Sequence, residues 1–545
     1  MRGLSDPRPS PWSPLRHRTF RALWVAMLAS NVGTWLQSVG SSWLMTSLTS
    51  SAVMVALVQA ATSLPMFLFS LPAGALADVV DRRRLLLVTQ VWMLLSALGL
   101  AGLTAAGVMT PWLLLLFITL LGLGAVFNQP AQQASVPEMV PREDLAAAVS
   151  LASVGFNIAR AVGPAVGGLI VAAAGAQANF LLNAASFLGV VVVIYRWKRP
   201  VEASMLPAER FLGAMRTGMR YVRHSPEVLA VIIRGSIFVL CASSLWALIP
   251  VVARDLGRGP AGYGLLLAAL GAGAVSAAMV LPRLSRRGST DLVVAVSNLV
   301  FAGAIVALGT VRSFWLLFAA LLGAGGAWLS LLSSLNVAIQ MLVPSWVRGR
   351  ALSVYMLFIF GGLTGGSALW GAVADRVGIS TALLISAGCM VLGLLATMGV
   401  HLRSGEGLNL APSRQWPAPQ IPDLQPEQGP VLVSIRYRID PERAAEFTAA
   451  MSELRRIRLR GGAMQWGLFA DSEEPGLYTE IFLVSSWMEH LRQHERITVA
   501  DEEVRLRVGS FHLGPEPPEV QHLIAERLRN DSRLPDTTRK VEDQP

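Results

Sequence analysis

The chain has 545 residues, of which 53% are hydrophobic and 15% are charged, and its mean hydropathy is +0.52. A soluble domain carries about 25% charged residues, so this composition excludes an ordinary soluble protein and indicates an integral membrane protein. The net charge is +10, but residues 1–403 hold 28 Lys and Arg against 12 Asp and Glu, whereas residues 404–545 hold 17 against 23. The positive charge therefore follows the membrane portion and does not indicate nucleic-acid binding.

Apolar stretches of about 20 residues or more recur along the first 400 residues. Arg and Lys concentrate in alternate loops between them, so the positive-inside rule places both termini in the cytoplasm. The N-terminal segment lacks a short apolar core with a cleavage site, and no cleaved signal peptide is expected. The stretches predict twelve spans, at residues 20–46, 52–77, 85–106, 111–135, 144–173, 176–196, 228–254, 260–281, 291–311, 314–342, 347–374 and 379–402.

Two related halves and a separate C-terminal region divide the chain. The halves align at an offset of 203 residues, which matches Pro141 with Pro344 and Ala148 with Ala351 and indicates a duplication. After the last span, a Pro- and Gly-rich stretch precedes strand and helix patterns in the order β-α-β-β-α. The predicted parts are an N-terminal six-helix half (1–196), a central cytoplasmic loop (197–227), a C-terminal six-helix half (228–403), a linker (404–428), a cytoplasmic α+β domain (429–515) and a disordered tail (516–545).

The turn between the second and third spans reads GALADVVDRRR. It resembles the loop signature of the major facilitator superfamily through Gly74, Asp78, Arg82 and Arg83, although a valine replaces a usual basic residue and Asp81 a usual glycine. The resemblance implies an all-α fold of twelve helices in two six-helix repeats. We interpret the turn as a cytoplasmic gating loop, in which Asp78 pairs across the interface of the halves until the transporter changes state. The alternative is that its arginines only fix the topology.

The fifth span contains Gly163, Pro164, Gly167 and Gly168. Glycines let helices approach closely, and close packing alone is one interpretation of the run. The run also resembles the exporter-associated Gly-Pro…Gly-Gly motif of the same superfamily, which implies export. Ser367 replaces the proline in the second half, so the motif is one-sided.

Polar side chains share helix faces in several spans. Arg160 is predicted near the bilayer centre, where an unpaired arginine is costly and is a functional candidate by default. Spans one, four, seven and ten line the central cavity in the superfamily, and the alternative for each polar residue is hydrogen bonding between helices. No Asp or Glu lies deep in a span, which counts against simple proton coupling, although a proton is the expected coupling ion. The substrate-cavity candidates are Asn31, Trp35, Asn128, Gln132, Asn157, Arg160, Asn336 and Gln340.

The C-terminal domain contains the run Tyr478–His494, which resembles the ending of transporters of the transmembrane secretion effector group. Its element order is similar to that of ferredoxin-like, dimeric α+β barrel domains of small monooxygenases, which implies that a dimer through this domain is an option. We expect His490, His494 and Glu495 to face solvent on a helix rather than to bind a metal. No cofactor, metal or catalytic residue is expected, and the chain is predicted not to be an enzyme.

The resemblance to the enterobactin-exporter-like branch implies a secondary active transporter of the bacterial inner membrane. It would export small amphipathic molecules, such as siderophores, drugs or secondary metabolites, by alternating access. Its partners would be that small-molecule substrate and the lipid bilayer. The alternative function is a transporter fused to a ligand-sensing or monooxygenase-like domain with its own activity. An importer is opposed only by the motif in the fifth span.

Overall fold

The computed structural model describes residue 10 and residues 12–197, 211–284, 289–399, 409–413 and 428–526. The chain divides into two compact units, each with a hydrophobic core of its own. The first unit comprises residues 1–215, 227–342 and 349–406, and the second comprises residues 216–226, 343–348 and 407–545.

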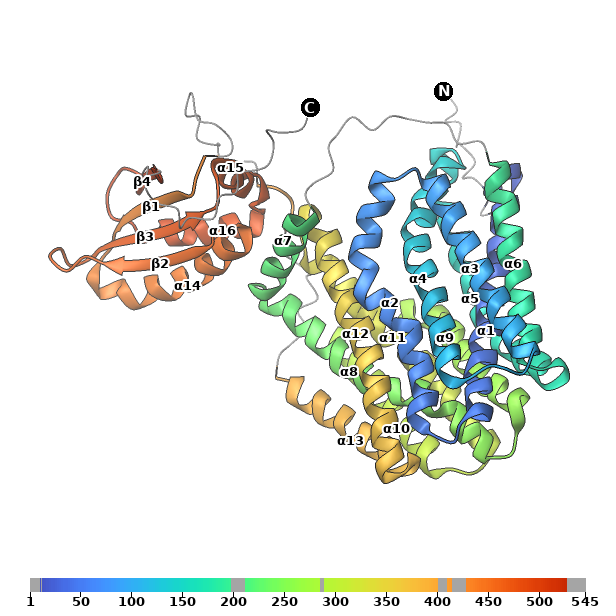
Figure 1. Ribbon diagram of the computed structural model, residues 1–545. Helices are drawn as coiled ribbons and strands as arrows, with labels where there is room; N and C mark the ends of the chain where they lie inside the picture. The colour runs from blue at the N-terminus through green and yellow to red at the C-terminus, as the bar shows by residue number, and fades with distance from the viewer. Residues whose placement is uncertain are drawn as a thin grey trace, which may run out of the picture. The chain divides into compact units, whose positions relative to one another are not determined.

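The first unit is a bundle of long helices in two halves (Figure 1). The first residues of α8 and α12 belong to the second unit. The N-terminal half contains η1 (Ser13–Arg16), α1 (Arg18–Leu48), α2 (Ala52–Val79), α3 (Arg82–Ala105), α4 (Pro111–Ser135), η2 (Val136–Glu138), η3 (Arg142–Asp144), α5 (Leu145–Ala174) and α6 (Ala176–Arg196). The C-terminal half contains α8 (Pro226–Asp255), α9 (Gly259–Leu284), α10 (Thr290–Thr310), α11 (Phe314–Leu342), α12 (Ser345–Val377) and α13 (Ile379–Thr397).

A helix lies over each predicted span, with bounds that differ by a few residues. Among the described residues, eleven helices are long and apolar enough to cross a membrane. Helix α1 is not one of the eleven, because polar residues such as Ser30, Asn31 and Gln37 interrupt its apolar sequence. The chain is therefore a multi-pass membrane protein, and a count of twelve crossings stays a prediction.

The turns that join the last two helices of each half repeat one backbone feature. Gly175, between α5 and α6, has φ 79°, and Gly378, between α12 and α13, has φ 86°. A left-handed conformation at a helix end favours glycine, which lacks the Cβ that would clash. The two glycines are 203 residues apart, the offset at which the halves align in sequence, and this supports the duplication.

Helix α5 joins the two halves of the first unit. It packs against α1 of its own half and against α9 of the other half, while α9 also packs against α11. Helices α2, α3, α4 and α6 contribute to a buried core in the N-terminal half that includes Met93, Leu100 and Phe180. The pair α5 and α9 is thus one contact between the halves.

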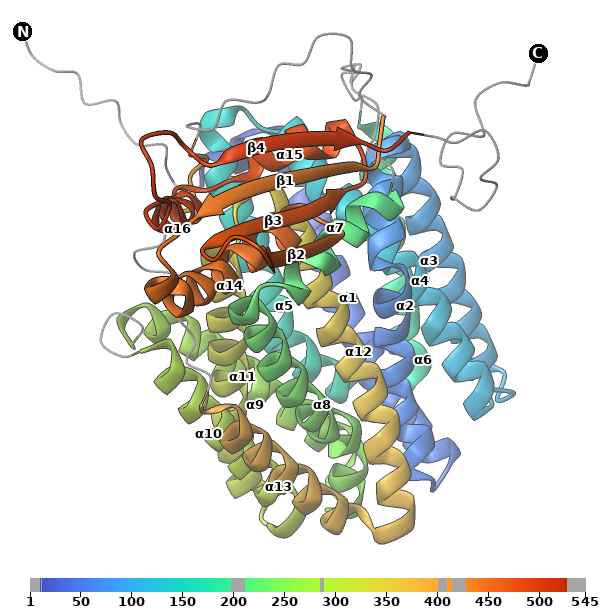
Figure 2. The ribbon, with the colours of Figure 1, turned by 90° about the vertical axis from the view of Figure 1, so that its left-hand side faces the viewer.

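The second unit contains a four-stranded antiparallel sheet in the order β2-β3-β1-β4 (Figure 2). Alternate residues of β1 are buried, including Val431 and Val433, and they share a core with Phe447 of α14 and Trp487 of α15. The helices therefore cover one face of the sheet. Its elements are α7 (Phe211–Arg223, from Arg216 on), β1 (Val431–Arg438), η4 (Pro441–Arg443), α14 (Ala444–Gly461), β2 (Gln465–Ala470), β3 (Leu477–Val484), α15 (Trp487–Arg496), α16 (Val499–Gly509) and β4 (Glu519–Ile524).

Two features differ from the sequence-based expectations. Residues 519–524 fall in the tail that we predicted to be disordered, yet they form β4, because β1 offers them an edge for antiparallel pairing. The last helix of the predicted β-α-β-β-α order is two helices, α15 and α16. The break occurs where Thr498 and Asp501 form a capping box that starts a new helix.

Candidate functional site

The loop between α2 and α3 holds its arginines within the N-terminal half. Asp81 caps α3 by accepting a hydrogen bond from the Arg84 backbone at 2.8 Å. Arg82 pairs with Glu138 at 2.8 Å, and Arg83 donates to the carbonyl of Tyr195 at 2.6 Å. Sequence reasoning missed Glu138, which lies 56 residues from Arg82 with no local pattern to mark it.

The two remaining residues of the gating loop lie at the end of α2. Gly74 is half-buried, and a Cβ built there would meet nothing within 4 Å. The side chain of Asp78 lies outside the described part of the structure. Its pairing across the halves therefore stays a prediction.

The glycines of α5 form close contacts with two helices. A Cβ at Gly163 would lie 2.6 Å from Cβ of Trp35, and one at Gly167 would lie 3.1 Å from Cα of Leu36, both on α1. A Cβ at Gly168 would lie 2.5 Å from the carbonyl oxygen of Pro260 on α9. Real Cβ atoms do not approach as closely as at Gly163 and Gly168, and the contact at Gly167 is tighter than most, so these three positions favour a residue without a side chain.

Two glycines of α9 complete this contact, and sequence reasoning missed them. A Cβ at Gly264 would clash with the carbonyl oxygen of Pro164, and one at Gly271 would lie 2.5 Å from the carbonyl oxygen of Arg160. Glycines are common in this chain, 49 in all, so nothing in the sequence distinguished these two. The backbones of α5 and α9 therefore touch across the halves, and we call this contact the α5–α9 seam.

Arg160 lies at the α5–α9 seam. Its backbone faces Gly271, its side chain is partly exposed, and within the described part of the chain it forms no hydrogen bond or ion pair. One turn earlier, Asn157 donates to the carbonyl of Ser153 at 2.9 Å. Trp35, which contacts Gly163, and Asn31 on the same helix are half-buried.

The other cavity candidates make contacts of different kinds. Asn128 is buried and accepts hydrogen bonds from Thr89 at 3.0 Å and Gln90 at 3.4 Å, an arrangement that favours hydrogen bonding between α3 and α4. Asn128 also donates to Gln132 at 3.3 Å. Gln340 is exposed and donates to Asn336 at 2.5 Å. Within the described residues, hydrogen bonds therefore link two pairs of candidates, Asn128 with Gln132 and Asn336 with Gln340, and not all eight.

A latch between the halves, also missed by sequence reasoning, lies at the end of the bundle that carries the α1–α2 loop. Asp375, near the end of α12, accepts hydrogen bonds from the Ala52 backbone at 2.6 Å and from the Ser51 hydroxyl at 2.7 Å. Its carboxylate thus sits at the N-terminus of α2, where the helix dipole favours negative charge. Ser63 of α2 and Thr364 of α12 approach to 2.8 Å deeper in the bundle.

We expect Asp375→Ala to shift the bundle towards a state in which this end is open. Loss of the carboxylate removes about 1 kcal/mol of helix-dipole and hydrogen-bond stabilisation, so the open population should rise about five-fold. Spin labels at Ser50 and Val377, in a background without Cys241 and Cys389, report the distance by electron spin resonance. Asp255→Ala is the matched control. Unchanged distance distributions in Asp375→Ala would rule out the latch.

Buried charges organise the C-terminal domain. Glu480 is fully buried and accepts from Arg458 at 3.0 Å, from Trp466 at 2.9 Å and from Tyr437 at 3.1 Å. Burial, and then the Glu480 carboxylate, raise the pKa of Tyr437 far above its usual range, so its hydroxyl remains a donor. A buried ion pair of this kind needs all its hydrogen bonds satisfied.

The expectation that His490 faces solvent is wrong. His490 is 2% exposed, and its ring lies against Trp487 and His522, with the His494 ring 4.8 Å away. The α15 face that bears His490 packs onto the sheet, so the histidine is part of the core. Among the described residues, no group of three His, Cys, Asp or Glu could hold a metal ion.

The long apolar helices, the duplicated halves and the seam between them define a membrane transporter of the major facilitator type. Solved structures support the fold. The POT family transporter PepTSo matches with a TM-score of 0.59 and 12% identity, and the match covers 72% of this chain and 98% of that one. A bacterial homologue of the iron transporter ferroportin, in an inward-facing state, matches with a TM-score of 0.53 and 16% identity. The match covers 70% of this chain and 98% of that one.

The chain belongs to the family described as transmembrane secretion effector, whose sequence model matches residues 9–530. Two named relatives are similar over most of their length. The staphyloferrin A transporter of Staphylococcus aureus is 26% identical over 64% of this chain and 87% of its own. The enterobactin exporter EntS of Shigella boydii is 27% identical, and the match covers 70% of this chain and 91% of EntS. The protein is thus a multi-pass transporter of the major facilitator superfamily, with relatives that are named for siderophores.

Proposed function

We propose that this transporter exports small amphipathic molecules, siderophores among them, by alternating access. The α5–α9 seam carries the proposal, because it gives the two halves a backbone-to-backbone contact about which they can rock. The name of the enterobactin exporter supports the direction of transport. The latch at Asp375 provides a second contact that must break and re-form in each cycle.

The topology that we propose has twelve crossings, with α1 as the first, and both termini on the cytoplasmic side of a bacterial inner membrane. The clustering of arginines in alternate loops supports it. The Asp375 latch then lies at the outward end. Asp78 would form the corresponding contact at the inward end.

The C-terminal domain is proposed to have a ferredoxin-like fold. The antiparallel order β2-β3-β1-β4 and the element order β-α-β-β-α-α-β support this assignment. A dimer through the domain is proposed to use the sheet face opposite the helices. We retain a proton as the proposed coupling ion, with the absence of Asp and Glu deep in the predicted spans as the argument against it.

Arg160 is proposed to contact anionic cargo at the seam. Transport into proteoliposomes, with enterobactin and staphyloferrin A as separate probes, tests both the function and the residue. We expect Arg160→Ala to lower the transport rate at least about ten-fold, which corresponds to a change of about 1.4 kcal/mol in free energy. Arg160→Lys should retain part of the rate because it keeps the positive charge.

Arg312→Ala, in the loop before α11, is the matched control and should transport normally. Full transport by Arg160→Ala would remove the residue from the site. Vesicles of defined orientation give the direction, and transport only towards the cytoplasmic side would contradict export. Failure of both probes in wild-type vesicles would count against siderophores as the cargo.

A further inference from the structure

Three segments far apart in the chain meet around one pocket in the second unit. Tyr221 comes from α7, Trp346 from the first residues of α12, and His490 and Gln493 from α15. The pocket contains about 470 Å³ of empty space, open solvent at its mouth included. Its walls combine aromatic rings with the apolar side chain of Ile457.

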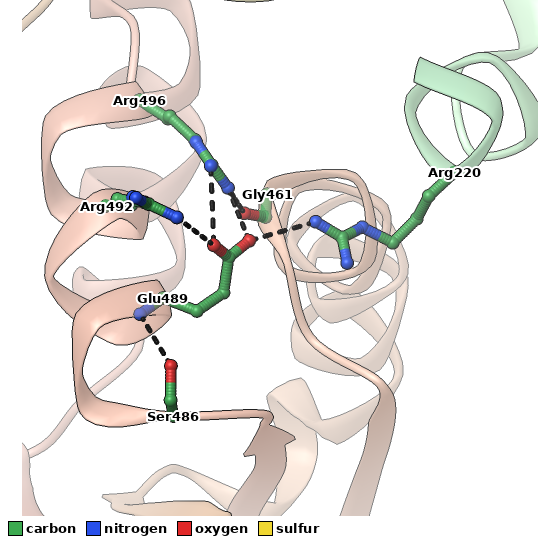
Figure 3. Close-up of polar contacts among 6 residues, drawn as sticks. All are labelled: Arg220, Gly461, Ser486, Glu489, Arg492 and Arg496. Atoms are coloured by element: carbon green, nitrogen blue, oxygen red, sulfur yellow. Dashed lines mark hydrogen bonds and ion pairs between the residues drawn. The ribbon is translucent and has the colours of Figure 1, made fainter. Parts of the chain in front are cut away.

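Ion pairs hold these segments together. Glu489 of α15 accepts from Arg220 of α7 at 3.1 Å and from Arg496 at 2.6 Å (Figure 3). Arg496 also donates to the carbonyl of Gly461 at 3.0 Å, and its guanidinium lies 4.6 Å from the Trp346 ring. Arg496 therefore contacts both the domain and the start of α12.

Three buried polar atoms at this pocket have no hydrogen-bond partner within the described part of the chain. They are Nε1 of Trp346, Nδ1 of His490 and Nε2 of Gln493. His490 and Gln493 are 2% and 7% exposed. Buried polar groups are almost always bonded, because each one left unbonded destabilises the fold. Three unbonded polar atoms at one pocket indicate that a bound molecule supplies their hydrogen-bond partners.

The chemistry of the walls defines that group. Trp346 and Gln493 offer N–H donors, which require acceptor atoms such as oxygen. Burial lowers the pKa of His490 to about 3, so its ring is neutral at pH 7. The flat faces of Tyr221, Trp346 and His490 suit a planar ring.

Charge sets the sign of the ligand. Three wall arginines have carboxylate partners: Arg458 with Glu480, Arg460 with Asp501 and Arg496 with Glu489. Arg220 and Arg492 share Glu489 with Arg496, so arginines outnumber carboxylates among these groups. The surroundings therefore favour an anionic ligand over a cation.

We propose that this pocket binds a small aromatic monocarboxylate and that its occupancy regulates transport. The carboxylate oxygens accept from Trp346 and Gln493, and the ring lies among Tyr221, Trp346 and His490. Helix α8 begins at Pro226, three residues after the end of α7, and α12 begins at Ser345. A bound ligand therefore joins α7, which precedes α8, and the first residues of α12 to the core of the C-terminal domain. The proposal does not depend on which cargo is moved.

Binding of 2-naphthoate to the full-length protein in lipid nanodiscs tests the proposal by saturation-transfer nuclear magnetic resonance. We expect saturable binding that weakens at least ten-fold in Gln493→Leu and in Trp346→Phe, which remove the amide donor and the indole N–H donor, respectively. Gln493→Leu leaves a side chain of similar size, whereas Trp346→Phe also makes the ring smaller. Gln521→Leu, an exposed amide on β4, is the matched control and should bind as wild type. Ligand should also slow hydrogen exchange in residues 216–226 and 343–348.

Three results would overturn the proposal. The first is an absence of saturable binding, which would mean that water alone satisfies the three atoms. The second is unchanged affinity in both variants. The third is binding that Arg160→Ala abolishes while Gln493→Leu leaves it intact, since the probe would then occupy the membrane bundle. Equal melting temperatures of the variants and wild type show that a loss of binding is not a loss of folding.

Discussion

Replacement of Glu480 by alanine is expected to destabilise the C-terminal domain by about 3–5 kcal/mol. The substitution leaves the Arg458 guanidinium buried without its carboxylate, and it removes the acceptor of Tyr437 and Trp466 as well. An isolated buried charge costs far more than an exposed pair contributes. The side chains of Glu480 and Arg458 are 0% and 7% exposed, so water cannot replace the lost partner.

Hydrogen exchange of the full-length protein in detergent measures this effect in peptides that cover residues 428–526. Glu474→Ala is the matched control, because Glu474 pairs with Arg438 at 2.8 Å on the surface. Loss of an exposed pair of this kind is expected to destabilise the domain by only about 0–1 kcal/mol. The double variant Glu480→Leu, Arg458→Met should recover much of the loss, since it leaves no unpaired charge. A change below about 1 kcal/mol in Glu480→Ala would contradict the assigned role of the pair.

The membrane helices could be predicted because lipid imposes one simple requirement on the sequence. A helix must present about 20 apolar residues, and its ends must satisfy polar groups at the interface. The predicted spans at 111–135 and 176–196 coincide with α4 and α6. The offset of 203 residues also recurs in the structure, where Gly175 and Gly378 take similar left-handed conformations.

The contacts between helices could not be predicted, because the partner of a side chain depends on packing that a single sequence does not encode locally. Arg234 of α8 is 7% exposed and pairs with Asp291 of α10 at 2.5 Å, although nothing in the local sequence marks the two residues as partners. Asp375 had no feature that distinguished it from an ordinary charge at a helix end. Its role as a latch becomes visible only in the structure, where the N-terminus of α2 lies against its carboxylate.

The C-terminal domain shows the same limit in a sheet. The alternation in β3 places Glu480 on the face that packs against the helices, where a charge is unexpected. Its partners lie on α14, β1 and β2, which pattern reasoning does not bring together. His490 similarly lies on the face of α15 that packs onto the sheet, although its neighbours in sequence are mostly polar.

Gly264→Leu should lower the transport rate more than about ten-fold. A Cβ at Gly264 would clash with the carbonyl oxygen of Pro164 and lie 2.9 Å from Cα of Gly168. These are backbone atoms of α5, which cannot rotate aside as a side chain can, so the two helices must separate. Overpacking of this kind typically costs about 1–3 kcal/mol, and here it displaces the contact about which the halves are proposed to rock.

Gly303→Leu on α10 is the matched control for this substitution. It adds the same side chain to a membrane helix at a position where a Cβ meets nothing within 4 Å. The transport rate in proteoliposomes and the melting temperature in detergent separate a blocked cycle from an unfolded protein. Gly264→Leu should lose transport even in the fraction that remains folded, because separated helices cannot re-form the α5–α9 seam. Transport by Gly264→Leu at the rate of Gly303→Leu would mean that the halves do not move about this seam, and the rocking mechanism would need another axis.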